Sequence, residues 1–139
     1  MKTLHNATTV KTVLVAALIA LTLACGYGSK TYPPVAGTVP AITQLNPDAA
    51  TAGGADFVLT VDGSNFGTKA VVNWNGTAQT TTTTYVSGNQ LTVTIPAAMI
   101  ATAGTAKVTV TNPGTTGNGQ YGSGGTLAET SSAVSFTIN

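Results

Sequence analysis

The sequence predicts an all-β domain, an antiparallel sandwich of short strands, over residues 40–139. Two observations point to this fold class. Threonine and valine, which favour strands, dominate the composition together with alanine and with glycine and asparagine, which favour turns. Apolar and polar residues also alternate in several short runs, as in strands with one buried face. Sheets with one solvated face are usually antiparallel.

The alternation is clearest in four runs: Phe57 to Asp62, Leu91 to Ile95, Lys107 to Thr111 and Val134 to Asn139. Weaker runs complete a count of about seven strands: Ile42 to Leu45, Val71 to Trp74 and Ala78 to Val86. The dipeptide Asn75-Gly76 predicts a tight hairpin turn, and Pro96 to Ala103 predicts a short helical turn. Seven short strands separated by turn signals indicate an immunoglobulin-like sandwich.

The first 24 residues have the pattern of a secretory signal peptide. Lys2, His5 and Lys11 form a cationic start. An apolar run of twelve residues follows, Val13 to Ala24, in which only Thr22 is polar. A membrane-spanning helix needs about 20 apolar residues, so this run matches the apolar core of a signal peptide better than a span. The sequence therefore predicts export.

The segment at the predicted cleavage site, Thr22-Leu23-Ala24-Cys25-Gly26, resembles a bacterial lipobox. The small residue before the cysteine suits the peptidase, and the thiol of Cys25 accepts the diacylglyceryl group. The resemblance implies a lipid anchor on Cys25, with the several acyl chains that stable attachment needs. Cys25 is the only cysteine, which excludes an intrachain disulfide. The alternative is a free thiol in an ordinary signal peptide that is cleaved elsewhere.

Residues 25–39 predict a lipidated cysteine and a flexible linker to the domain. Glycine, serine and proline dominate Gly26 to Thr38, and no apolar periodicity appears. Pro33-Pro34 stiffens the middle of this segment. The predicted organisation is a signal peptide at 1–24, the anchor and linker at 25–39 and one sandwich domain at 40–139.

A series of motifs in the mature chain follows the order of a known family. The motifs are Pro40-Ala41-Ile42, Leu45-Asn46-Pro47, Ala52-Gly53-Gly54, Val61 to Gly67, Val72 to Gly76, Leu91 to Pro96 and Val108 to Asn112. In this order they resemble an IPT/TIG domain from Pro40 to Asn139. The resemblance implies an immunoglobulin-like fold and a surface binding or spacer role. Gly63 and Gly67 are expected to supply backbone freedom at a tight bend, and Phe66 to plug the sandwich end.

The charge distribution excludes nucleic acid as a partner. The mature part keeps three lysines and four carboxylates, so its net charge is three minus four, or −1, and the chain has no arginine. Binding a polyanion requires clustered lysine and arginine. Some IPT/TIG members in transcription factors contact DNA, but the basic residues that this role needs are absent here.

The residue types also argue against an enzyme, a metal site and a cofactor. The only histidine, His5, lies in the leader, so no Ser-His-Asp or Cys-His site and no usual zinc site can form. Asp56 and Asp62 are about 20 Å apart along one strand, too far for paired glycosidase carboxylates. The remaining alternatives are an approach of Asp48 or Glu129 through the fold, and calcium bound by Asp62 with backbone carbonyls.

Residues 113–126, PGTTGNGQYGSGGT, have the composition of an adaptable binding loop at one end of the sandwich. The candidate ligand-binding residues are Asn118, Gln120, Tyr121 and Ser123, with Tyr121 as the anchor. The alternative is a flexible insertion that binds nothing.

Three further features have more than one interpretation. Trp74 shares the alternation of Val72, which favours a core residue over a sugar-stacking one. Thr80 to Thr84 form a hydrogen-bonding ligand face or a soluble strand, and O-glycosylation is a third alternative. Asn75-Gly76-Thr77 matches an N-glycosylation pattern, which we attribute to chance in a bacterial lipoprotein.

Together these patterns predict an exported cell-envelope lipoprotein, anchored in the membrane through Cys25. Because no aspartate follows that cysteine, the anchor is expected in the outer membrane if the host is Gram-negative. The predicted function is non-catalytic surface binding or adhesion to a glycan or an envelope protein. The alternative is a purely structural spacer or envelope-assembly component.

Overall fold

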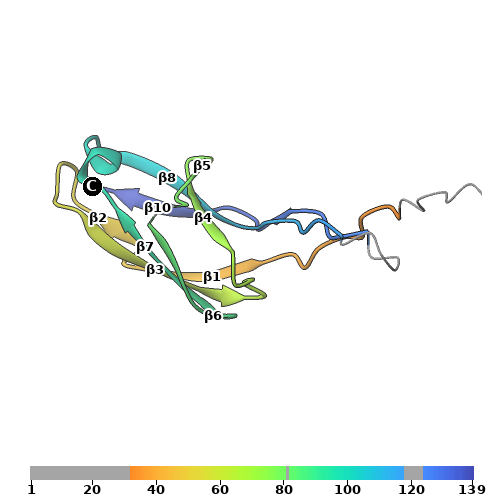
Figure 1. Ribbon diagram of the computed structural model, residues 1–139. Helices are drawn as coiled ribbons and strands as arrows, with labels where there is room; N and C mark the ends of the chain where they lie inside the picture. Colours follow the sequence, from red (N-terminus) through yellow and green to blue (C-terminus); the bar gives the residue numbers. More distant parts are fainter. Residues whose placement is uncertain (1–31, 81, 118–123) are drawn as a thin grey trace, which may run out of the picture. The chain divides into compact units, whose positions relative to one another are not determined.

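The computed structural model describes residues 32–80, 82–117 and 124–139 of the chain. These residues form two β-sheets packed face to face, an immunoglobulin-like β-sandwich (Figure 1). The predicted fold class is therefore confirmed. The predicted signal peptide and Cys25 lie outside the described residues.

The first sheet has the strand order β1-β3-β7-β6, with β1 at Ala41–Asn46, β3 at Phe57–Ser64, β6 at Thr83–Ser87 and β7 at Gln90–Ile95. The second has the order β2-β10-β8-β4-β5, with β2 at Ala49–Ala50, β4 at Val71–Trp74, β5 at Thr77–Ala78, β8 at Gly104–Asn112 and β10 at Val134–Ile138. Strand β9 (Glu129–Thr130) pairs with β8, and the 3-10 helix η1 (Ala97–Ile100) confirms the predicted helical turn. The pairing of β2 with β10 is parallel, so the sandwich is not purely antiparallel as predicted.

The core lies between the two sheets and contains the apolar positions of the alternating runs. Leu59, Leu91 and Phe136 have no exposed surface. The Phe136 ring lies 5.6 Å from that of Phe57 and 5.1 Å from that of Trp74, measured between centroids. Trp74 is only 3 % exposed, which confirms its prediction as a core residue. Its Nε1 is one of two buried side-chain atoms without a hydrogen-bond partner in the described part of the chain.

The single strand predicted over Ala78 to Val86 is wrong. The chain leaves the second sheet after β5 and enters the first sheet as β6. Buried Gln79 holds the crossing point, because its N–H donates to the Val72 carbonyl (2.8 Å) and its own carbonyl accepts from the Thr83 hydroxyl (2.6 Å). A run of threonines favours strand throughout and carries no turn signal, so the sequence pattern does not mark this crossover.

The predictions for the two turns that flank β4 had different outcomes. Asn75 and Gly76 both have positive φ, 49° and 81°, which confirms the predicted hairpin turn between β4 and β5. At the bend after β3, the residue with positive φ is Asn65 (61°), not Gly63 or Gly67. Gly63 is needed for close approach instead, because a Cβ there would overlap the Ala41 carbonyl oxygen and lie 2.6 Å from the Phe66 ring. The predicted reason for this glycine was therefore wrong, whereas Phe66 is buried as predicted.

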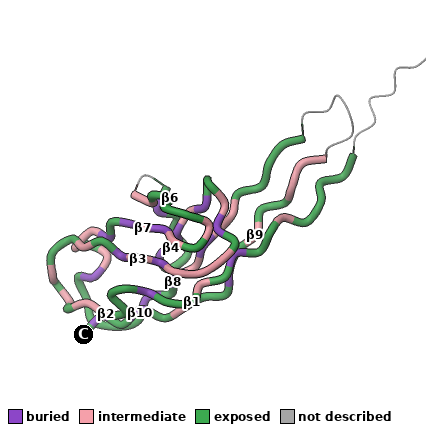
Figure 2. Tube along the Cα trace, turned by 90° about the horizontal axis from the view of Figure 1, so that it is seen from below, coloured by how far each residue is buried: buried purple, intermediate pink, exposed green. Residues whose placement is uncertain are grey.

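A stalk of three extended segments leaves one end of the sandwich (Figures 1 and 2). We define the stalk as residues 32–39, 113–117 and 124–128. Thr126 bridges Thr115 on one side and Val35 on the other. Backbone hydrogen bonds join the segments, from the Thr115 N–H to the Thr126 carbonyl (3.0 Å) and from the Leu127 N–H to the Val35 carbonyl (2.9 Å). Part of the predicted linker is therefore paired with the flanks of the predicted binding loop.

Within the described ranges, no helix is both long and apolar enough to cross a membrane.

Candidate functional site

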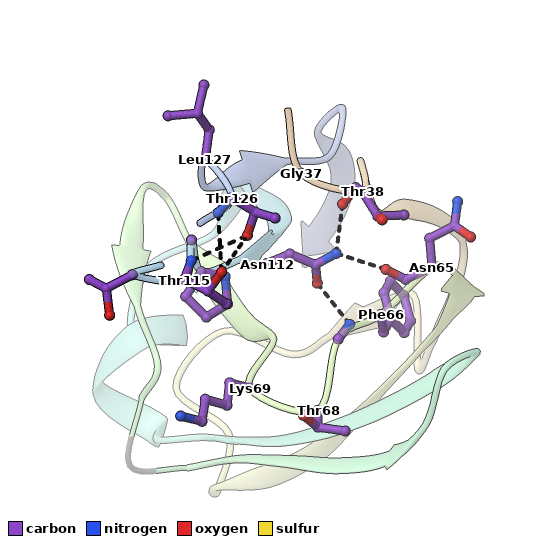
Figure 3. Close-up of a pocket in the computed structure, with 14 residues that line it drawn as sticks. Gly37, Thr38, Asn65, Phe66, Thr68, Lys69, Asn112, Thr115, Thr126 and Leu127 are labelled. Carbon is purple, nitrogen blue, oxygen red and sulfur yellow. Dashed lines mark hydrogen bonds between the residues drawn. The ribbon is translucent and has the colours of Figure 1, made fainter. Parts of the chain in front are cut away.

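An open groove of about 710 Å³ lies where the stalk joins the sandwich (Figure 3). Three parts of the chain line it: the first stalk segment, the loop between β3 and β4, and the chain from the end of β8 into the other two stalk segments. The lining residues are Gly37, Thr38, Asn65, Phe66, Gly67, Thr68, Lys69, Asn112, Pro113, Gly114, Thr115, Thr116, Thr126 and Leu127. The groove is therefore built from segments that are far apart in the sequence.

The side-chain amide of Asn112, the last residue of β8, holds these parts together. Its Nδ2 donates to the backbone carbonyls of Thr38 and Asn65, each at 2.8 Å. Its Oδ1 accepts from the Gly67 N–H at 2.9 Å. Figure 3 shows the amide directed between the first stalk segment and the β3–β4 loop. A single side chain thus joins the first stalk segment, the β3–β4 loop and β8.

The hydroxyl groups of the groove differ in the number of hydrogen bonds that they form within the described chain. The hydroxyls of Thr115 and Thr126 lie 3.1 Å apart, and each also accepts from the other residue's N–H (3.1 and 3.2 Å). Thr68 and Thr116 are exposed and form no side-chain hydrogen bond with another described residue. As far as the described residues go, these two hydroxyls have no partner and are the groove's candidates for contact with a ligand.

The groove is nearly uncharged. Lys69 is the one ionisable side chain among the lining residues, and no ion pair within the described ranges involves it. The only aromatic lining residue, Phe66, is 4 % exposed and offers no stacking platform. Most drug-sized ligand sites are enclosed, whereas this groove is open. Hydroxyl and amide groups lie among its apolar lining, so the groove suits a segment of a polymer that combines hydrogen bonds with packing contacts.

The outer face of the first sheet carries a second polar surface. The register places Asn46, Thr60, Thr92 and Thr84 in one row across its four strands. None of these three threonines forms a side-chain hydrogen bond with another described residue. On the outer face of the second sheet, by contrast, the Asn73 amide donates to the hydroxyls of Thr109 (3.1 Å) and Thr111 (2.9 Å). Of the run Thr80 to Thr84, only Thr84 belongs to the row, so the predicted ligand face is not formed by that run alone.

The predicted binding residues Asn118, Gln120, Tyr121 and Ser123 lie outside the described residues, and their role stays a prediction. The flanks of their loop belong to the stalk and line the groove. Sequence reasoning missed Asn112, Thr68 and Lys69 as site residues. The only signal for Asn112 was that it ends the last of the family-like motifs.

Two of the four carboxylates considered for catalysis or metal binding, Asp56 and Asp62, have structural partners. Asp56 Oδ1 accepts from the Ala97 N–H at the start of η1 (2.8 Å), and Asp62 Oδ1 accepts from Gln90 Nε2 (2.8 Å). Among the residues that the structure describes, no group of three or more histidine, cysteine, aspartate or glutamate residues is placed to hold a metal ion. These two carboxylates therefore have roles in holding loop and strand positions.

The two packed sheets, with a groove at one end, define the described part of the chain as an immunoglobulin-like module. The family model of the IPT/TIG domain matches residues 40–129, and the chain belongs to the IPT/TIG domain family. Domains of this kind are generic binding or structural modules and are generally non-catalytic. No curated protein and no solved structure matches the chain.

Proposed function

We propose that this chain is a non-catalytic, lipid-anchored cell-envelope lipoprotein that binds a glycan through the groove at the stalk end of its sandwich. The groove itself carries the proposal. It presents the Thr68 and Thr116 hydroxyls, which have no partner among the described residues, and only one charged lining residue, Lys69, in an open channel. Hydroxyls and amides recognise the hydroxyls of a neutral or weakly acidic glycan by direct and water-mediated hydrogen bonds.

The proposed anchor rests on the lipobox-like segment before the domain. Cys25 precedes the first described residue, Tyr32, by seven positions. An anchored chain would keep the sandwich close to the envelope polymers of its own cell. This location favours an envelope glycan over a soluble ligand.

A structural spacer is the second candidate, and one observation favours it. The three hydrogen bonds of Asn112 satisfy polar groups on both sides of the groove. The same geometry therefore also suits a firm connection between the linker and the sandwich, a role that needs no ligand.

The groove variant Thr68→Trp separates the two candidates. The side chain of Thr68 is exposed and lines the groove, so an indole there fills the space without entering the core. We expect glycan affinity to fall about ten-fold, which is about 1.4 kcal/mol. The measurement is binding of the full mature chain to an array of neutral and acidic envelope glycans, followed by titration of each glycan retained.

Two matched variants make this test specific. Thr105→Trp places the same indole at an exposed position at the other end of β8, and Thr92→Val removes a hydroxyl from the row on the first sheet. Both are expected to bind as the wild type does. Equal binding by Thr68→Trp would exclude the groove as the site, loss in Thr92→Val would move the site to the threonine row, and no glycan binding by the wild type would favour the spacer.

A further inference from the structure

The stalk combines exposed apolar side chains with a complete lack of charge. Seven large apolar side chains are exposed in the described chain, and four of them belong to the stalk: Tyr32 (46 %), Val35 (63 %), Val39 (54 %) and Leu127 (51 %). The described stalk residues include no lysine, aspartate or glutamate. All six described ionisable lysine, aspartate and glutamate side chains lie elsewhere, at Asp48, Asp56, Asp62, Lys69, Lys107 and Glu129.

The apolar side chains point to more than one side of the stalk. Val35 bridges Thr126, so these two side chains share one face of the paired segments. Leu127 follows Thr126 along the same extended segment and therefore projects to the opposite face. In Figure 3 the Leu127 side chain points away from the groove. A flat protein interface would cover one face, whereas the interfacial layer of a bilayer surrounds a narrow stalk and contacts both faces.

The proposed anchor determines which partner the exposed apolar side chains of the stalk can contact. Seven residue steps separate Cys25 from Tyr32, and a fully extended chain advances at most about 3.6 Å per residue. The start of the stalk therefore lies within about 25 Å of a lipid on Cys25. Of the described residues, those of the stalk are the ones that this tether brings nearest to the bilayer.

We propose that the stalk docks directly on the lipid bilayer, in its interfacial layer, and orients the sandwich with the groove toward the membrane. This inference rests on the proposed lipidation of Cys25. The described stalk residues carry no charge of their own to desolvate, and tyrosine is favoured at the membrane–water interface. Glu129 and Lys69 lie beside the stalk, against Gly37 and in the groove, and are expected to stay at the level of the headgroups. The outer edges of its extended segments carry backbone groups that need polar partners, which places the stalk among the headgroups and not in the hydrocarbon.

A second copy of the chain fits the stalk less well. A stable protein interface buries about 800 Å² on each partner with a well-packed core. The stalk has three narrow segments with apolar side chains on both faces, so one partner surface covers only part of them. Stalk-to-stalk crosslinking in the test below is the outcome that would show such a partner.

The experiment uses the full mature lipoprotein in phospholipid vesicles that contain a nitroxide-labelled lipid quencher. Cys25 is the only native cysteine, so an acylated chain accepts a thiol-reactive fluorophore at one introduced position. Leu127→Cys labels the stalk, and Thr102→Cys labels an exposed residue just before the β8 end that lies farthest from the stalk. We expect the lipid quencher to reduce fluorescence at Leu127→Cys and to leave that at Thr102→Cys unchanged.

The intact mass of each sample separates this inference from the proposed function. An acylated chain with equal fluorescence at the two positions, quenched or unquenched, would overturn the docking of the stalk and leave the anchor standing. Efficient Leu127→Cys disulfide formation between chains would assign the stalk to a second copy. A native chain with unmodified Cys25 would refute the proposed anchor and this inference with it.

Discussion

Replacing Phe136 by alanine is expected to lower the free energy of unfolding by about 3–5 kcal/mol. Phe136 is fully buried in β10, and its ring contacts Phe57 and Trp74 from the two sheets. Truncation removes this contact between the layers and leaves a cavity that the β-sheets cannot close. The measurement is the urea unfolding midpoint, followed by tryptophan fluorescence, since Trp74 is the only tryptophan and lies against the removed ring.

Two variants calibrate this prediction. Phe136→Leu keeps most of the buried volume and is expected to lose less than half as much stability. Val58→Ala truncates a side chain that is 58 % exposed on β3 and is expected to change stability by at most about 0.5 kcal/mol. If Phe136→Ala unfolded at the wild-type midpoint, the packing of the two sheets described above would be incorrect.

The second large effect is expected for Asn112→Asp, about 2 kcal/mol of destabilisation. Aspartate keeps an oxygen for the Gly67 N–H but has no donor for the carbonyls of Thr38 and Asn65. The carboxylate would then face two carbonyl oxygens at hydrogen-bonding distance. The first stalk segment and the β3–β4 loop are therefore expected to separate from β8, which opens the groove.

Hydrogen exchange locates this effect. The Leu127 N–H, bonded to Val35, is expected to exchange faster in Asn112→Asp, while the Val93 N–H in the core of the first sheet changes only as global stability changes. Asn89→Ala is the control, because its exposed amide donates a single long-range hydrogen bond, to the Gly63 carbonyl. Unchanged exchange at Leu127 would mean that Asn112 does not hold the stalk to the sandwich.

The core of this fold was predictable because period-two alternation is a local property. The runs around Leu59, Leu91, Val108 and Phe136 each carry their buried face within a few residues, and the structure buries those faces. The crossover between β5 and β6 was not predictable in this way. It depends on Gln79 and Thr83, which lie within a polar stretch without glycine or proline.

The groove was not predictable for a different reason. Asn112 bonds to residues 74, 47 and 45 positions away, at Thr38, Asn65 and Gly67. No local pattern encodes which carbonyl an asparagine at the end of a strand will meet. The sequence did indicate that the loop beginning at Pro113 was the most distinctive segment outside the core, and the flanks of that loop form part of the groove.

We have proposed that this IPT/TIG module acts from the surface of a membrane, anchored through Cys25. The most direct test is the intact mass and N-terminal sequence of the native protein, purified from the membrane fraction of its host. The account predicts a chain that begins at Cys25 and carries a diacylglyceryl group, with or without a further amide-linked acyl chain. A chain with unmodified Cys25, or one cleaved at another position and recovered in a soluble fraction, would contradict the account.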